Sequence, residues 1–320
     1  MVYRDAIRHQ SVAVRRQYNL LIGALYEEGD VESARQVAEL AVAQGVWRDP
    51  MQRPPHYVAE LEPRPVYDPD EFWFTAYLED NYEKIRAELD AVTRTDEHGF
   101  MPVEELLLER GRWDQVVLYE GGVRFDEACA RFPVTTSIVE GIPDATVAGP
   151  GVVTISWLYP GSHIVPHCGG SNARLRVHLG LRVPEGPRFR VGNEMLTWQE
   201  GKCLVFDDGF EHEVWHEGTE PRVVLLLDVS HPYVSPDVRD WMISGRSLFT
   251  ERMRSYMAER GIERVDVNGD DEVILHPNLG IATLARRYLR ELNTSAAELR
   301  DGTLVFPDQP RLYEKPSGER

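Results

Sequence analysis

The sequence has few of the features that mark secreted, membrane-spanning or nucleic-acid-binding proteins. Its three cysteines, among 320 residues, have spacings that fit neither a disulfide framework nor a metal motif. No apolar run approaches the ~20 residues of a membrane span, and the first residues lack a basic and then apolar signal pattern. The net charge of −18 leaves no dense cationic surface for phosphates. We therefore expect a cytoplasmic protein with reduced thiols and no nucleic-acid or membrane partner.

The first 47 residues predict a helical hairpin. Gly29 and Asp30 separate two stretches in which apolar residues recur at helical spacing. These apolar residues are Leu20, Leu21, Ala24, Leu25, Ala34, Val37, Ala38 and Ala41. The second stretch resembles one tetratricopeptide unit, but no second copy follows at a fixed period, and stacking normally needs about three repeats. We expect a hairpin packed on the main domain rather than a peptide-binding array.

Residues 48–235 predict a mainly β domain with flanking helices. Proline is frequent in 48–69, which indicates an extended strap, and 70–91 and 104–110 have helical patterns. A first strand follows Trp113, and from Val152 onward short alternating segments are separated by Gly, Pro, Asn and Asp. Short strands without intervening helices are typical of an antiparallel jelly roll.

Residues 236–320 return to a helical pattern and continue as a mixed segment with a polar tail. We interpret them as an α-rich C-terminal α/β extension of unknown role. A lid and a dimer arm are both compatible with the pattern. The run LNTSAAELRDG also faintly resembles small winged-helix modules that hold leader peptides, which keeps substrate recognition open as a third role.

Two histidines are the candidate metal ligands. His167 and His212 each stand at a strand end or turn, 45 positions apart, a separation that can bring together the two sheets of a jelly roll. Neutral imidazole binds divalent metals of the iron group at pH 7. A single histidine at a strand end is more often a hydrogen-bonded structural residue, so the pair carries the hypothesis.

Arg222 opens the most apolar strand of the sequence, VVLLLDV. A guanidinium that faces inward from such a strand needs an anion, because an unpaired buried charge is very costly. Two kinds of partner are open at this point. One is a small-molecule carboxylate, which the planar guanidinium binds in bidentate fashion. The other is a structural carboxylate, Asp207, Asp208 or Asp228.

Arg174, Arg176 and His178 alternate along RLRVHLGL and therefore project from one face of a strand. The apolar residues between them project from the other face. A solvated sheet surface is the simpler explanation, but two arginines and a histidine with no lysine or glutamate beside them favour a lined pocket.

Several motifs in the same order resemble the aspartyl/asparaginyl β-hydroxylase family of Fe(II)- and 2-oxoglutarate-dependent dioxygenases. They are PGSHIVPHCGGSNARLRVHLGL, RVGNE followed by TWQEGK, FDDGFEHEVW and RVVLLLDVSHP, with looser similarity back to about Arg48. The resemblance implies a double-stranded β-helix, the jelly-roll or cupin-like fold. It does not extend past Pro236.

The resemblance also implies roles for individual residues. His167 and His212 would bind iron. One carboxylate of 2-oxoglutarate would be held by Arg222 and Ser156, and its other end would be lined by Arg176, His178 and Trp113. Dioxygenases of this type usually carry Asp or Glu two residues after the first histidine. This chain has Gly169 there, as the family does, and we expect that Asp208 is not a third ligand.

Gln115, Arg174 and Asp208 match positions that touch substrate in the family. Leu108 and Thr154 stand where family members use further basic residues to grip an acidic substrate. This argues against a folded, disulfide-rich growth-factor-like domain as the target. We expect an amino-acid or peptidyl substrate hydroxylated at an unactivated carbon, with the β-carbon of Asp or Asn the first candidate.

Three functions are therefore compared. The first is a dioxygenase that uses Fe(II), 2-oxoglutarate and O2 and forms succinate and CO2. The second is a non-catalytic, cupin-like module that binds or senses a dicarboxylate. The third is a structural interaction protein built on the hairpin, which leaves Arg176, His178 and Arg222 unexplained.

Overall fold

The computed structural model describes residues 2–95, 98–103, 107–146 and 150–235, and three short strands beyond them. These strands, β14 (Arg264–Val267), β15 (Glu298–Arg300) and β16 (Thr303–Phe306), form a small sheet. The helix expected directly after Pro236 lies outside the described residues. None of the described helices combines the length and the apolarity needed to cross a membrane.

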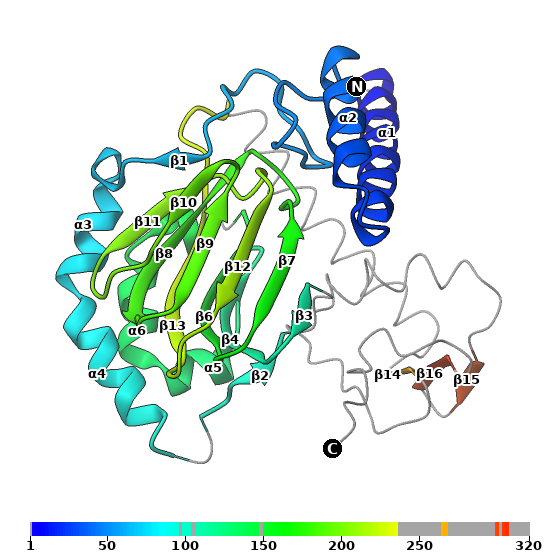
Figure 1. Ribbon diagram of the computed structural model, residues 1–320. Helices are drawn as coiled ribbons and strands as arrows, with labels where there is room; N and C mark the ends of the chain where they lie inside the picture. The colour runs from blue at the N-terminus through cyan, green and yellow to red at the C-terminus, as the bar shows by residue number, and fades with distance from the viewer. Residues whose placement is uncertain are drawn as a thin grey trace.

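Two antiparallel sheets face each other and form the double-stranded β-helix (Figure 1). The larger sheet contains β6 (Val152–Leu158), β8 (Arg174–Arg182), β11 (Cys203–Phe206) and β13 (Arg222–Ser230), in the order β11-β8-β13-β6. The smaller sheet contains β7 (His163–His167), β9 (Pro187–Val191), β10 (Glu194–Leu196) and β12 (His212–His216), in the order β10-β9-β12-β7. Because the chain passes repeatedly from one sheet to the other, the jelly-roll prediction is confirmed.

Further strands extend both sheets. β4 (Trp113–Glu120), β2 (Met101–Pro102) and β5 (Val123–Arg124) follow β6, and β1 (Val66–Tyr67) pairs with β11. β3 (Leu108–Arg110) pairs with β7 at the edge of the smaller sheet. The helix predicted for 104–110 is therefore wrong at its end: the open edge of β7 supplies backbone partners that outweigh the local helical pattern.

Five helices and one 3-10 turn cover the outer face of the larger sheet. They are η1 (Pro69–Glu71), α3 (Trp73–Asp80), α4 (Tyr82–Val92), α5 (Asp126–Arg131), α6 (Pro133–Glu140) and α7 (Pro143–Thr146). Leu78, Ile85 and Leu89 from α3 and α4 are fully buried in one apolar cluster with the outward side chains of β6, β8, β11 and β13. Full burial of each large side chain stabilises the fold by about 1.5–3 kcal/mol.

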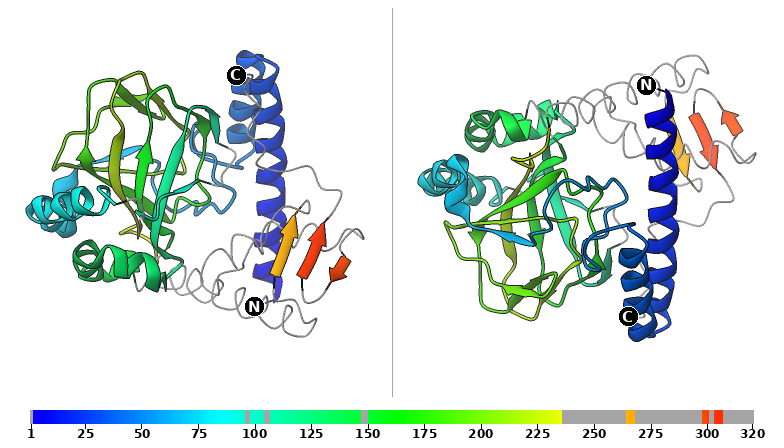
Figure 2. Two further views of the ribbon diagram at one scale, coloured as in Figure 1. Left: turned by 90° about the horizontal axis from the view of Figure 1, so that it is seen from below. Right: turned by 90° about the horizontal axis from the view of Figure 1, so that it is seen from above.

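The predicted N-terminal helices are present as α1 (Val2–Glu27) and α2 (Val31–Ala43). The turn between them uses Gly29 at φ 78° and Asp30, whose Oδ1 caps α2 by accepting from the Ser33 backbone N–H at 3.0 Å. Figure 2 shows the hairpin on one side of the two sheets and helices α3–α6 on the other.

Candidate active site

The site lies between the two sheets, where the inward residues of β6, β8 and β13 face β7, β9 and β12. β-strand alternation explains this division. Leu175, Val177 and Leu179 of β8 join the outer apolar cluster, so Arg174, Arg176 and His178 point inward. The pocket predicted from the RLRVHLGL pattern therefore has its residues on one interior face.

His167 and His212 are directly opposite each other across β7 and β12, with ring centroids 4.0 Å apart. The Nδ1 of His167 lies 2.8 Å from the carbonyl oxygen of Val165, and the Nδ1 of His212 lies 2.9 Å from that of Phe210. A carbonyl can only accept, so each Nδ1 carries the proton. Each Nε2 consequently keeps a lone pair, which is the tautomer that a metal ligand requires.

Burial lowers the pKa of both histidines below the ordinary value, and that of His212 is lowered far. The neighbouring imidazole adds to the shift at His212. Both rings are therefore neutral at pH 7. A neutral pair whose Nδ1 atoms are already fixed by the backbone fits a divalent metal.

Gly169 has no room for a side chain. A Cβ placed there would lie 2.3 Å from Oδ2 of Asp208, a fully buried residue. The Asp208 carboxylate is held in turn by Nη2 of Arg174 at 2.8 Å and by Nη2 of Arg176 at 3.2 Å. Within the described residues, no group of three His, Cys, Asp or Glu side chains is placed to hold a metal ion. A metal here would rely on two histidines and leave its other positions to small ligands.

Arg222 is 2% exposed, and no residue in the described part of the chain accepts a hydrogen bond from its Nε. Its guanidinium lies over the ring of Trp198, 4.8 Å from the centroid. Burial lowers its pKa from the ordinary value with no neighbouring carboxylate to oppose the shift. An unpaired guanidinium in the interior indicates that an anion belongs beside it.

The three structural carboxylates considered as partners for Arg222 are engaged elsewhere. Asp207 accepts from Nε2 of Gln52 at 2.5 Å, and Asp228 accepts from Nε of Arg176 at 2.8 Å and Nη2 at 3.1 Å. Asp208 belongs to the same arginine network. Among the described residues, therefore, none of these three carboxylates is paired with Arg222.

His178 provides a second unpartnered donor. Its Nδ1 accepts from Nε1 of Trp198 at 3.0 Å, so the proton of the neutral ring is on Nε2, for which the described residues provide no partner. Burial, and then the charge of Arg222, lower the pKa of His178 well below its ordinary value. The Phe206 ring contacts the rings of both His178 and His212, at centroid distances of 5.1 and 5.9 Å. The donor pair and the histidine pair therefore border one interior.

Trp198 was not among the residues predicted for the site, although it packs on both Arg222 and His178. It is brought there by Gly180, which forms a bridge to Glu200 and where a Cβ would lie 2.2 Å from the carbonyl oxygen of Gln199. The TWQEGK motif was the available signal. From the sequence pattern alone, Trp198 is predicted to lie in a turn, and only the structure shows that its segment packs against β8.

Ser156 and Trp113 lie together on the inner face of the larger sheet. Ser156 is 2% exposed, and its Oγ accepts from Nε1 of Trp113 at 2.9 Å, which leaves its hydroxyl proton able to donate to a ligand. Ser156 is also in register with Val224, two pairs along the ladder from Arg222 and its partner Leu158. The two residues predicted to share one carboxylate are thus near neighbours.

The residues predicted to contact substrate occupy the same interior. Arg174 contacts both Asp208 and Asp228, the latter at 3.3 Å. Gln115 is in register with Ser156, and its Oε1 accepts weakly from Thr154 Oγ1 at 3.4 Å. The roles of these residues toward a substrate stay predictions.

Comparisons with known proteins agree with this architecture. The family model for aspartyl/asparaginyl β-hydroxylase matches residues 79–232. The human aspartyl/asparaginyl β-hydroxylase is 38% identical over 228 residues, which are 70% of this chain and 30% of that protein. An ornithine lipid ester-linked acyl 2-hydroxylase from Rhizobium tropici is 36% identical over 201 residues, 60% of this chain and 70% of that protein.

The chain therefore belongs to the aspartyl/asparaginyl β-hydroxylase family. It spans less than a third of the human and mouse hydroxylases, covering 30% and 31% of their lengths. A solved oxidoreductase of the 2OG-Fe(II) oxygenase family from Burkholderia pseudomallei is 17% identical, with 54% of this chain and 96% of that chain covered at a TM-score of 0.34. At that score the likeness supports no conclusion about this chain.

Proposed function

We propose that the chain is a dioxygenase that uses Fe(II), 2-oxoglutarate and O2 to hydroxylate an unactivated carbon, with release of succinate and CO2. The observation that carries the proposal is Arg222, a buried guanidinium with no anion beside it among the described residues. It shares an interior with two histidines whose Nδ1 atoms are engaged by backbone carbonyls, so that each Nε2 keeps its lone pair. A metal and a dicarboxylate together satisfy both groups.

The residues present fit these ligands. His167 and His212 would hold the metal through Nε2, while Arg222 and the Ser156 hydroxyl would bind one carboxylate of 2-oxoglutarate. His178 would donate its Nε2–H to the bound cosubstrate. Bound iron, with the cosubstrate and O2, supplies the oxidising chemistry, and the protein orients the ligands and excludes water with the apolar side chains between the sheets.

We propose an amino-acid or peptidyl substrate, with the β-carbon of Asp or Asn as the first candidate. The named function of the human relative supports this choice. The bacterial relative is named for an acyl chain of an ornithine lipid, so an acyl substrate is the competing outcome. Incubation with a panel of peptides, free amino acids and aminolipids, followed by mass spectrometry for a gain of one oxygen, separates the two.

The decisive assay is oxygen-dependent formation of succinate from 2-oxoglutarate with anaerobically loaded Fe(II). We expect His167→Ala and His212→Ala each to lower the rate of succinate formation by more than roughly 100-fold. Mutation of residues that only hydrogen-bond to metal ligands typically costs less than this. His216→Ala, which removes a third histidine of the same sheet, is the matched control. Turnover that survives either ligand change contradicts the metal assignment.

Binding without turnover supports the dicarboxylate sensor instead. In that case calorimetry finds tight binding of 2-oxoglutarate to the Mn(II)-loaded protein, and no substrate in the panel stimulates succinate formation. If the protein binds neither a metal nor a dicarboxylate, the result supports the third hypothesis, a structural interaction protein.

We also propose that the protein acts in a reducing compartment such as the cytoplasm. Its three cysteines are free thiols, and Cys129 and Cys203 are buried. Fractionation of the producing cells tests this proposal, and recovery from an oxidising extracytoplasmic compartment contradicts it.

A further inference from the structure

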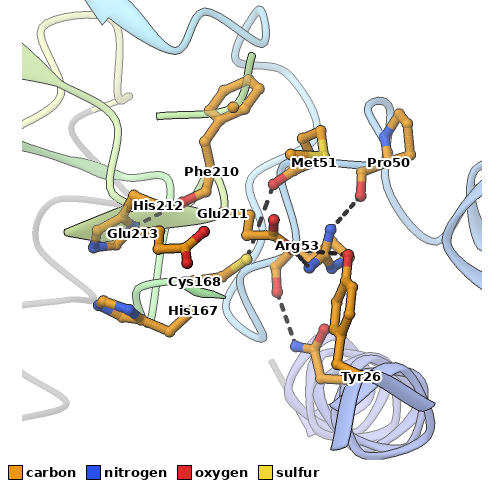
Figure 3. Close-up of polar contacts among 12 residues, drawn as sticks. Tyr26, Pro50, Met51, Arg53, His167, Cys168, Phe210, Glu211, His212 and Glu213 are labelled. Atoms are coloured by element: carbon orange, nitrogen blue, oxygen red, sulfur yellow. Dashed lines mark hydrogen bonds and ion pairs between the residues drawn. The ribbon is translucent and has the colours of Figure 1, made fainter. Parts of the chain in front are cut away.

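The N-terminal part of the chain contacts the backbone on either side of both candidate metal ligands. The carbonyl oxygen of Met51 accepts from the backbone N–H of Glu211 at 2.6 Å, and it lies 3.9 Å from the Sγ donor of Cys168 (Figure 3). Glu211 directly precedes His212, and Cys168 directly follows His167. One carbonyl thus connects the two segments that carry the histidines.

The residues after Met51 continue this connection. Gln52 forms a bridge with Phe210, and the Arg53 N–H donates to the carbonyl oxygen of Gly209 at 2.9 Å. Further on, the His56 N–H donates to the carbonyl oxygen of Gly170 at 3.1 Å. Residues 51–56 therefore run from the His212 segment to the His167 segment and contact the backbone of both.

A cluster of side chains connects residues 51–56 to the hairpin. The Glu211 carboxylate accepts from Arg53 Nη2 at 2.5 Å, from Arg190 Nη2 at 2.8 Å and from the Tyr26 hydroxyl of α1 at 3.2 Å. Asn19, also on α1, donates from Nδ2 to the Arg53 carbonyl at 2.9 Å. The Arg53 and Glu211 side chains are only 6% and 5% exposed.

The position of this cluster separates it from the ligand set. Glu211 and His212 are consecutive on the chain and point in opposite directions, so the carboxylate faces α1 while the imidazole faces the interior (Figure 3). The carboxylate anchors the backbone that carries His212, and its charge also acts through space on His167, where it raises the pKa against the larger lowering by burial. Replacing a buried ion pair with apolar residues is often neutral for stability, so stabilisation alone is a weak reason for its presence.

We propose that Tyr26, Arg53 and Glu211 are positioning residues, through which helix α1 sets the separation of His167 and His212 and hence the affinity of the site for its metal. The inference rests on the proposed function, since it requires that the two histidines bind a metal. It gives the hairpin a role in the chemistry of the site, beyond packing on the main domain.

Calorimetry with Mn(II) on the full-length chain, paired with urea unfolding of each variant, tests the proposal. Tyr26→Phe removes one hydroxyl from the cluster, and Tyr18→Phe is the matched control, because its hydroxyl on the same helix donates to Gln44 at 2.5 Å and does not reach Glu211. We expect Tyr26→Phe to raise the Mn(II) Kd by roughly 2–10-fold and Tyr18→Phe to leave it unchanged.

The double variant Arg53→Met with Glu211→Leu separates positioning from stability. It removes both buried charges, and Arg190 retains Glu213 as a partner at 3.1 Å. We expect an unfolding midpoint close to that of the wild type and a Mn(II) Kd raised by about 10–100-fold, the range for residues that orient metal ligands.

A folded double variant or Tyr26→Phe that binds Mn(II) as tightly as the wild type overturns the inference. An affinity loss that Tyr18→Phe reproduces also overturns it, because the effect would then be a general consequence of loosening the hairpin. Failure of the wild-type chain to bind Mn(II) has a different meaning: it contradicts the proposed metal site itself.

Discussion

The two faces of the larger sheet differ in what satisfies their side chains. On the outer face, Leu175, Val177 and Leu179 are fully buried against helices. On the inner face, Arg176 belongs to an ion-pair network, while Arg222 and His178 each have a donor without a partner among residues 2–95, 98–103, 107–146 and 150–235. The same strands thus carry one face satisfied by apolar packing and another face with donors that the described residues leave unpaired.

The difference shows how the fold accommodates the energetic cost of the charges buried in the site. Burying Arg174, Arg176, Asp208 and Asp228 together is acceptable because each charge contacts an opposite one. The unmatched Arg222 has no such compensation among the described residues. The apolar outer core must offset its cost, so stability is concentrated on one face and ligand affinity on the other.

The largest expected effect comes from the outer face. Leu225→Ala removes a fully buried side chain at the centre of β13, between β6 and β8. We expect the free energy of unfolding to fall by about 2–5 kcal/mol, because a cavity is left behind. Urea denaturation measures this, with Leu20→Ala as the control, since Leu20 is 66% exposed. Equal losses of unfolding free energy in the two variants would contradict the assignment of the outer core as the main source of stability.

A change on the inner face should lower ligand affinity rather than stability. Arg222→Met deletes the unpaired guanidinium and keeps an unbranched apolar side chain over Trp198. We expect affinity for 2-oxoglutarate to fall roughly 100-fold, or about 2–3 kcal/mol. The unfolding free energy should hold or rise, since a costly buried charge is gone. Calorimetry on the Mn(II)-loaded protein measures the affinity for 2-oxoglutarate, and urea unfolding measures the stability. A variant that loses stability but keeps its affinity would contradict the assignment of ligand binding to the inner face.

Acid should act through the interior histidines rather than through the apolar core. Burial lowers the pKa of His178 and His212, and that of His231 to about 4. Below pH 6.5 the unfolded chain therefore binds more protons at these positions, and folding stability falls. Asp207, with a pKa raised to about 7 by burial, opposes this with a single site. We expect a net loss of about 1–2 kcal/mol between pH 7 and pH 5.5.

Urea unfolding at each pH provides the measurement. His231→Gln keeps a polar group beside the Tyr67 hydroxyl, which lies 2.8 Å from His231 Nε2, and removes the titrating ring. Its stability should depend less steeply on pH than that of the wild type. A profile unchanged by the substitution would assign the acid sensitivity to other groups.

The smallest effect is expected at Ser156. Ser156→Ala removes the acceptor of the Trp113 indole N–H and a donor predicted for the cosubstrate. The loss of one hydrogen bond predicts about 1 kcal/mol, or a KM for 2-oxoglutarate several-fold higher, with kcat little changed. Steady-state kinetics measure this, and Thr154→Val is the control, because the Thr154 hydroxyl donates to the backbone carbonyl of Val116 at 2.9 Å. A KM that rises equally in both variants would assign the effect to general repacking of the inner face.

Much of the fold and the candidate ligands could be predicted from local pattern. Alternation placed Arg176 and His178 on one face because side chains along a strand have a period of exactly two. The helices before and after Gly29 followed from helical spacing. The resemblance to the family identified His167 and His212 as candidate ligands although they are far apart in sequence. Matching motifs does not require knowing which strands pair.

The failures share one cause, which is contact between segments distant in sequence. Residues 108–110 form a strand because the edge of β7 is open to them. Trp198 covers Arg222 and His178 because Gly180 lets its segment approach β8. The contact of Met51 with both ligand segments depends on where the hairpin packs. No local periodicity encodes such approaches.

The sequence by itself determined which side chains are available and which face of each strand they occupy, because covalent geometry and periodicity are local. The tertiary structure decided how the charges are shared. Three carboxylates stood open as partners of Arg222, and the pairing of β8 with β13 brought Asp228 to Arg176 instead. Electrostatic pairing acts through space over a few ångströms. The unpaired state of Arg222, on which the proposed function rests, is therefore a property of the folded chain.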